Sequence, residues 1–85
     1  MQVTTDSYTD SIAGAVRAEL ARSNKRFIDI APVLHISRAT AYRRITGLTP
    51  FDVSELEKIA NFLGISVQDI FDSAEYARQR AERAA

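Results

Sequence analysis

Apolar residues recur at intervals of three and four along most of this 85-residue chain, which is the period of an α-helix. The pattern begins with Ile12, Val16 and Leu20 and returns in Ile59 and Leu63. No stretch alternates with the period of two that a half-buried strand needs. The sequence therefore predicts an all-α fold.

The fourth helix has the clearest start and end. Asp52 and Glu55 have the spacing of a capping box, and Phe51 and Leu56 have that of the hydrophobic staple that accompanies it. Gly64 follows the last apolar residue and is expected to close the helix in a left-handed conformation. The acids are therefore interpreted as caps and not as a catalytic pair. The apolar-face aromatics are interpreted as core: Phe51, Phe62 and Phe71.

Small polar residues and glycine mark the remaining helix ends. The expected caps are Thr9 or Asp6 for the first helix, Ser37 for the third and Ser66 for the fifth; the expected ends are Ser23-Asn24 and Gly47. These signals divide the chain into five short helices with tight connections.

The second helix contains Pro32, which lacks a backbone N–H and disturbs a helix interior. This helix either starts late, with Pro32 in its first turn, or is bent. His35 follows it and is interpreted as a turn residue, because histidine tolerates a positive φ better than most residues. The connection from Leu34 to Ser37 has the length of the turn in a helix-turn-helix unit.

The charge of the chain is zero overall but unevenly distributed. Residues 17–49 hold seven basic and two acidic residues, a net charge of +5, whereas residues 1–16 and 50–85 carry −2 and −3. Such asymmetry predicts a basic face with an anionic partner. The chain has no cysteine and one histidine, so we expect no metal site, no cofactor and no small-molecule ligand. Without a nucleophile–base pair or a glycine-rich phosphate loop, we expect no enzyme activity.

The third helix separates on a helical wheel into a polar and an apolar side. The polar side is predicted to expose Arg38, Ala39, Tyr42, Arg43 and Thr46, and the apolar side to bury Ala41, Ile45 and Leu48. Arginine can bind guanine with two hydrogen bonds, an alanine methyl can meet that of thymine, and tyrosine can reach a phosphate. Arg44 lies off this face. The alternative interpretation is an ordinary solvated helix surface.

From about residue 12 to residue 71 the chain resembles the Cro and lambda-repressor type of helix-turn-helix family. The resemblance lies in Ile30-Ala31 and Leu34, in ISRAT with Arg43 and Gly47, in Pro50-Phe51, and in LEKIANFLGIS followed by VQDIF. It implies a compact five-helix domain whose third helix reads DNA, and a dimer on operator half-sites.

Carried over by position, the resemblance implies base contacts by Arg38, Ala39 and Arg43. It implies groove-edge or phosphate contacts by Thr40, Tyr42, Thr46, Lys25, Arg26, Phe27 and Thr49. Phe27 stands where the family commonly has a phosphate-binding glutamine, so only its backbone N–H is expected to serve there.

The prediction is a sequence-specific regulator of the phage Cro or small repressor type, which binds a double-stranded DNA operator and acts by occlusion. The expected parts are a polar arm (1–9), the helix-turn-helix domain (10–72) and a helical or frayed tail (73–85). A weak homodimer is expected through Ile65, Val67 and the fifth helix, or through Tyr76. The polar N-terminus and short apolar runs predict a soluble cytoplasmic protein without a membrane span. The alternatives are an antitoxin-like regulator whose tail binds a protein, and a protein-only interaction module.

Overall fold

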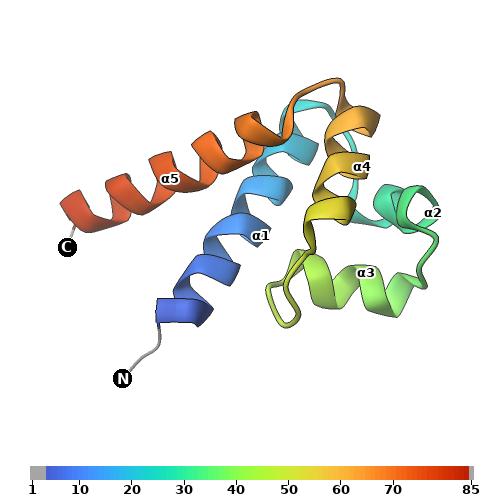
Figure 1. Ribbon diagram of the computed structural model, residues 1–85, viewed down its shortest axis with the longest axis horizontal. Helices are drawn as coiled ribbons and strands as arrows, with labels where there is room; N and C mark the ends of the chain where they lie inside the picture. The colour runs from blue at the N-terminus through green and yellow to red at the C-terminus, as the bar shows by residue number, and fades with distance from the viewer. Residues whose placement is uncertain (1–3, 85) are drawn as a thin grey trace.

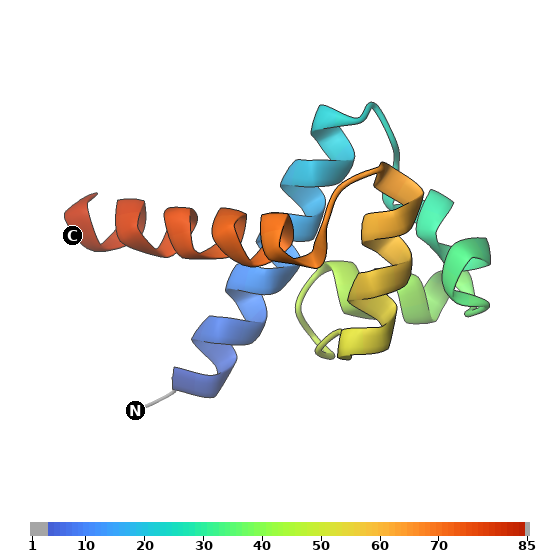
Figure 2. The ribbon, with the colours of Figure 1, turned by 45° about the horizontal axis from the view of Figure 1, so that its top comes forward.

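The computed structural model describes the backbone of residues 4–84 and the side chains of residues 8–84. The described elements are α1 (Thr4–Arg22), the 3-10 turn η1 (Phe27–Asp29), α2 (Ile30–Leu34), α3 (Arg38–Ile45), α4 (Val53–Leu63) and α5 (Val67–Ala84). Helices α2, α3 and α4 gather on one side, and α1 crosses α5 on the other (Figures 1 and 2). The C-terminal part of α5 projects away from the other helices.

One apolar core joins all five helices. It contains Ile12, Ala15, Val16 and Leu20 of α1, Ile30, Ala31 and Leu34 of α2, Ala41 and Ile45 of α3, Leu56, Ile59 and Ala60 of α4, and Ile70 and Ala74 of α5. The residues expected from helical spacing thus meet in one place, and burying them supplies the main driving force for folding. Among the described residues, no helix is long and apolar enough to cross a membrane.

The predicted capping box at α4 is confirmed. The Asp52 side chain accepts from the Glu55 N–H at 2.7 Å, and the Glu55 side chain accepts from the Asp52 N–H at 3.0 Å. Ser37 caps α3 by accepting from the Thr40 N–H at 3.0 Å. Gly47 and Gly64 both have positive φ, at 85° and 73°. These ends form where predicted because each depends on residues within one helical turn.

The second helix takes the late start that Pro32 allowed. Residues 27–29 form the 3-10 turn η1, and α2 begins only at Ile30, so that Pro32 lies in the first turn of α2. There its missing N–H costs no helical hydrogen bond. His35 has a φ of 57° and ends α2 in the left-handed conformation, which confirms it as the turn residue.

Helices α1 and α5 are longer than their predicted counterparts. Helix α1 begins at Thr4, so Asp6 and Thr9 lie inside it and the prediction that one of them caps its start was wrong. Residues 4–9 of the expected polar arm are helical, and residues 1–3 lie outside the described residues. Residues 73–84 continue α5, so the tail takes the helical alternative. The two helices support each other where the guanidinium of Arg78 lies 5.4 Å from the ring centre of Tyr8.

Two predictions of burial need correction. Leu48 is 72% exposed and not on the buried side, because α3 ends at Ile45 and the chain turns before Leu48, so the helical wheel no longer applies there. Phe62 is 36% exposed, with the Lys25 ammonium 5.3 Å from its ring centre, and therefore lies at the margin of the core. Ile65 and Val67, which were expected at the dimer contact, are half-buried and pack against the core.

Candidate nucleic-acid interface

Helix α3 presents the polar face that the wheel predicted. Five side chains on it are exposed: Arg38, Ala39, Tyr42, Arg43 and Thr46. Ala41 and Ile45, on the opposite side, are 0% and 4% exposed and anchor the helix in the core. The helix is therefore fixed by one side while its other side stays accessible.

Arg44 holds α3 against α4. Its Nε and Nη2 donate to the two carboxylate oxygens of Glu55 at 3.0 and 3.1 Å, and the two side chains are only 20% and 13% exposed. The hydrogen bonds to Glu55 raise the pKa of the Arg44 guanidinium above its ordinary value, which strengthens the hold of Arg44 on its positive charge. Since Glu55 also accepts from the Asp52 N–H, one carboxylate joins the cap of α4 to the last turn of α3.

Replacement of Arg44 is expected to lower stability, whereas replacement of its neighbour Arg43 is not. Arg44→Ala leaves the half-buried Glu55 carboxylate without its cation and should cost about 2 kcal/mol of unfolding free energy. Arg43→Ala removes an exposed side chain and should change it by less than about 0.5 kcal/mol. Urea denaturation of both variants measures the difference. Equal stability of the two variants would contradict a structural role for Arg44.

Arg17 on α1 makes a second contact that positions α3. Its Nη1 donates to the backbone carbonyl of Ile45 at 2.6 Å, across 28 positions of sequence. Ile45 is the last residue of α3, and its carbonyl is one of those that a helix leaves without an intrahelical partner. A cation at this end also favours the helix dipole. Arg17 therefore serves the attachment of α3 rather than its exposed face.

The basic residues of the middle segment divide into two groups. Arg17 and Arg44 position α3, and Arg22 pairs with Glu19 on its own helix at 3.2 Å. The four remaining basic residues of this segment are exposed and form no salt bridge among the described side chains: Lys25, Arg26, Arg38 and Arg43. The face available to an anionic partner is therefore smaller than the sequence count suggested.

Arg43 is oriented by a short chain of hydroxyl contacts. Its Nη2 donates to the Thr40 hydroxyl oxygen at 3.1 Å, and that oxygen also accepts from the Ser37 hydroxyl at 3.0 Å. Thr40 is half-buried. The helix cap thus extends to the guanidinium, which is held against the outer face of α3 while most of its donors stay accessible.

Two of the proposed phosphate ligands use polar groups within the chain. The Thr46 hydroxyl donates to the Tyr42 carbonyl at 2.8 Å. The Thr49 backbone N–H donates to the Arg43 carbonyl at 3.1 Å, so it closes the end of α3. Only the hydroxyl oxygen of Thr46 and the half-buried side chain of Thr49 remain for an outside partner.

The start of η1 supplies the rest of the candidate face. The Arg26 backbone N–H donates to Asp29 at 2.8 Å, while its side chain is exposed. Phe27 is the first residue of η1, where a backbone N–H has no partner within the helix. Its ring is 39% exposed and meets Tyr42 of α3 edge to face, with 6.1 Å between ring centres.

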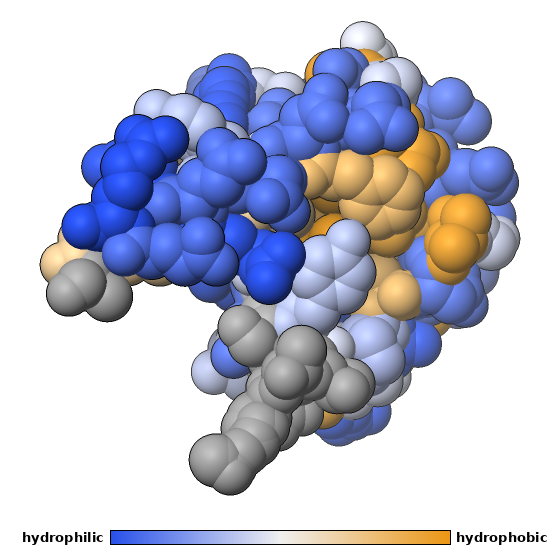
Figure 3. Space-filling view, turned by 60° about the vertical axis from the view of Figure 1, so that its left-hand side comes forward, coloured by the Kyte–Doolittle hydropathy of each residue, from blue (hydrophilic) through white to orange (hydrophobic). Residues whose placement is uncertain are grey.

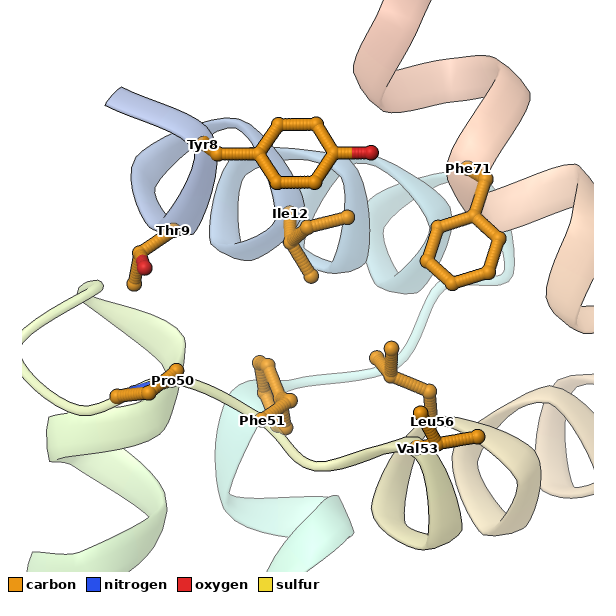
Figure 4. A pocket seen from close by; sticks show the side chains of 8 residues that line it. All are labelled: Tyr8, Thr9, Ile12, Pro50, Phe51, Val53, Leu56 and Phe71. Atoms are coloured by element: carbon orange, nitrogen blue, oxygen red, sulfur yellow. The ribbon is translucent and has the colours of Figure 1, made fainter. Parts of the chain in front are cut away.

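An apolar hollow of about 440 Å³ lies between α1, the start of α4 and the start of α5 (Figure 4). It is lined by Tyr8, Thr9, Ile12, Pro50, Phe51, Val53, Leu56 and Phe71. Tyr8 and Val53 are 51% and 63% exposed. The space-filling view shows apolar residues gathered between hydrophilic ones on one face of the molecule (Figure 3). In the described part of the chain, no group of three histidine, cysteine or acidic side chains is placed to hold a metal ion.

The contacts of Arg17 with Ile45 and of Arg44 with Glu55 were not predicted from the sequence. The helical wheel placed Arg44 off the exposed face but could not name Glu55 as its partner, 11 positions away. The Phe27–Tyr42 pair was also missed, since each residue was interpreted by itself. The position of Arg44 off the exposed face of the wheel is the signal that set it apart from Arg38 and Arg43.

Comparison with known proteins identifies one family and one solved structure. The model of a family described as the BetR domain matches residues 10–81. The crystal structure of the clp gene regulator ClgR from Corynebacterium glutamicum is similar, with a TM-score of 0.78 and 20% sequence identity, over 91% of this chain and 84% of that chain. No curated protein sequence matches.

The two matches agree with the fold predicted from the sequence. They confirm the all-α, five-helix architecture and the resemblance to Cro-type helix-turn-helix regulators. The solved structure that shares this fold is described as that of a gene regulator.

Proposed function

The chain belongs to the BetR domain family, and from this premise we propose that it binds double-stranded DNA in a sequence-specific manner with α3 in the major groove. The observation that carries the proposal is the exposed face of α3. There Arg38, Ala39 and Arg43 stand outward on a helix that is anchored from behind. Guanidinium groups so placed match the guanine edge in the major groove, and the alanine methyl matches that of thymine.

The contacts outside α3 fit the phosphates that flank a groove. Lys25 and Arg26 precede η1, and the Phe27 N–H lies at the start of this turn, where a backbone donor suits an anion. The margin of the exposed face of α3 holds the other residues proposed for groove-edge or phosphate contacts: Thr40, Tyr42, Thr46 and Thr49. The chain would then act as a repressor that occludes an operator, because a domain with its α3 helix in the major groove covers the duplex to which it binds.

Selection from a random duplex library, followed by sequencing of the enriched duplexes, tests the proposal. We expect an enriched motif with guanine at positions read by Arg38 or Arg43. We expect it as an inverted repeat whose half-site centres lie about 34–36 Å apart, one turn of the duplex. If correctly folded protein enriches no sequence from the library, DNA recognition is ruled out and the alternative, a protein-only interaction module, is favoured.

The dimer is proposed to be weak in the absence of DNA. Ile65 and Val67 are packed against the core, and Tyr76 is an exposed ring, 60% accessible, with the Arg80 guanidinium 5.9 Å from its centre. A further apolar surface is the hollow beside Val53, which we propose as the contact with a second copy. On a palindromic duplex, the two α3 helices of such a dimer would lie about one duplex turn apart.

Sedimentation is expected to show mostly monomer at low micromolar concentration and two protomers on each palindromic duplex. Val53→Glu places a charge at the mouth of the hollow and should reduce binding to one protomer per duplex, because burying an unpaired carboxylate is costly. Tyr76→Ala is the control for the alternative surface on α5. Loss of the second protomer in Tyr76→Ala but not in Val53→Glu would move the dimer contact to α5.

A further inference from the structure

Two exposed aromatic rings meet at the junction of η1 and α3. Phe27 is 39% exposed and Tyr42 is 53% exposed, and their planes are inclined at 68° in an edge-to-face contact. This arrangement is favourable for aromatic pairs and restrains both rings. Since neither ring is needed to fill the core, the pair leaves an ordered apolar surface in contact with water.

The surroundings of this pair are cationic. Lys25 and Arg26 come just before Phe27, and Tyr42 lies one helical turn after Arg38 and directly before Arg43. All four side chains are exposed, and no ion pair among the described side chains engages them. A ligand that fits this surface therefore carries anionic groups at its edges and an apolar group between them.

Duplex DNA offers that combination in its major groove. Phosphates line the groove, and among the base edges only thymine presents an apolar group there, the methyl carbon at C5. We infer that Phe27 and Tyr42 together contact the C5 methyl group of a thymine at the edge of each half-site and so determine specificity at that position. This inference rests on the proposed DNA binding and adds a residue pair that reads one base.

The restrained geometry of the pair supports a methyl contact. Because the two rings already restrain each other, they lose little side-chain entropy when a methyl group binds against them. Removing one buried methyl group from the ligand costs about fourfold in affinity. The effect of the aromatic pair should appear at one thymine per half-site, apart from any effect at a thymine that Ala39 contacts.

Replacement of each thymine of the selected site by uracil, one position at a time, tests the inference without altering the protein. Uracil lacks only the C5 methyl group and keeps the pairing with adenine. We expect one position in each half-site at which uracil weakens binding about fourfold. If no uracil replacement changes the affinity of the unaltered protein by more than about 1.5-fold, the pair reads no methyl group and the inference is overturned.

Variants assign the methyl contact to its residues. In Tyr42→Ala and in Phe27→Ala, the ratio of thymine to uracil affinity at that position should fall to about one, while Tyr42→Phe should retain it. Tyr76→Ala removes a comparably exposed tyrosine on α5 and should also retain it. Ala39→Gly removes the other methyl-binding candidate. A ratio lost in Ala39→Gly and kept in both aromatic variants would assign the methyl to Ala39 and overturn the inference.

The outcome is separable from that of the proposed function. If folded protein binds no duplex, the proposed function fails before any thymine is replaced. If it binds a defined site whose affinity ignores the thymine methyl groups, the proposed function stands and only the role of Phe27 and Tyr42 is withdrawn. Circular dichroism and thermal melting of each variant establish that the fold is retained.

Discussion

A fourfold rise in salt concentration is expected to weaken the binding of one protomer to its preferred duplex about a hundredfold. Four exposed cations near the outer face of α3 form no salt bridge among the described side chains: Lys25, Arg26, Arg38 and Arg43. Each phosphate that a cation neutralises releases bound counterions, so log affinity falls linearly with log salt. We expect a slope that corresponds to on the order of three to six phosphates per protomer. Fluorescence anisotropy over a series of salt concentrations measures it.

Two variants serve as controls for this slope. Arg26→Ala removes a flanking cation and should reduce the slope by about one without changing the preferred sequence. Arg22→Ala removes a cation that is already paired with Glu19, so the slope should stay unchanged. An affinity that hardly depends on salt would argue against DNA as the partner, because every major contact proposed outside the bases is to a phosphate.

Arg43→Ala is expected to cost about 1–3 kcal/mol at the preferred site and to relax the base preference at one position. The Arg43 guanidinium is held by Thr40 on the outer face of α3, where it can donate two hydrogen bonds to guanine. The other three bases do not present this pair of acceptors, so removal of the Arg43 side chain lowers the affinity for guanine relative to the other bases. The matching measurement is the affinity for the selected site and for its three single-base variants at that position.

Arg44→Ala is the matched control, one residue along the same helix. Its side chain is engaged by Glu55 and not by the exposed face. It should weaken binding to all sequences alike, in proportion to lost stability, and leave base preference unchanged. If Arg44→Ala alters base preference while Arg43→Ala does not, the assignment of the exposed face of α3 is wrong.

The exposed face of α3 followed from angles along one helix. Arg38, Tyr42 and Arg43 lie within one wedge of the wheel, and Ala41 and Ile45 lie opposite, so periodicity alone separated outside from inside. It failed at Leu48, because the chain had already left the helix. The base contacts assigned to this face stay predictions.

Helix ends were predictable for a similar reason. The caps of Ser37 and Asp52 and the left-handed turn at His35 depend on neighbours within three or four positions. The early start of α1 and the length of α5 were not predictable in this way. Both rest on contact between two ends of the chain, such as that of Tyr8 with Arg78, and the tail by itself has too thin an apolar face to form a stable helix.

By itself, therefore, the sequence determined which segments are helical, where most of them end and which side of α3 faces outward, since all of these arise from interactions within a turn or two. Only the tertiary structure decided which cations remain on the surface. Arg44 pairs with Glu55 across 11 positions and Arg17 reaches Ile45 across 28, so two of seven basic residues hold the helix instead of facing a partner. A helical wheel gives a side chain's direction, but a partner on another helix is chosen by how the helices pack.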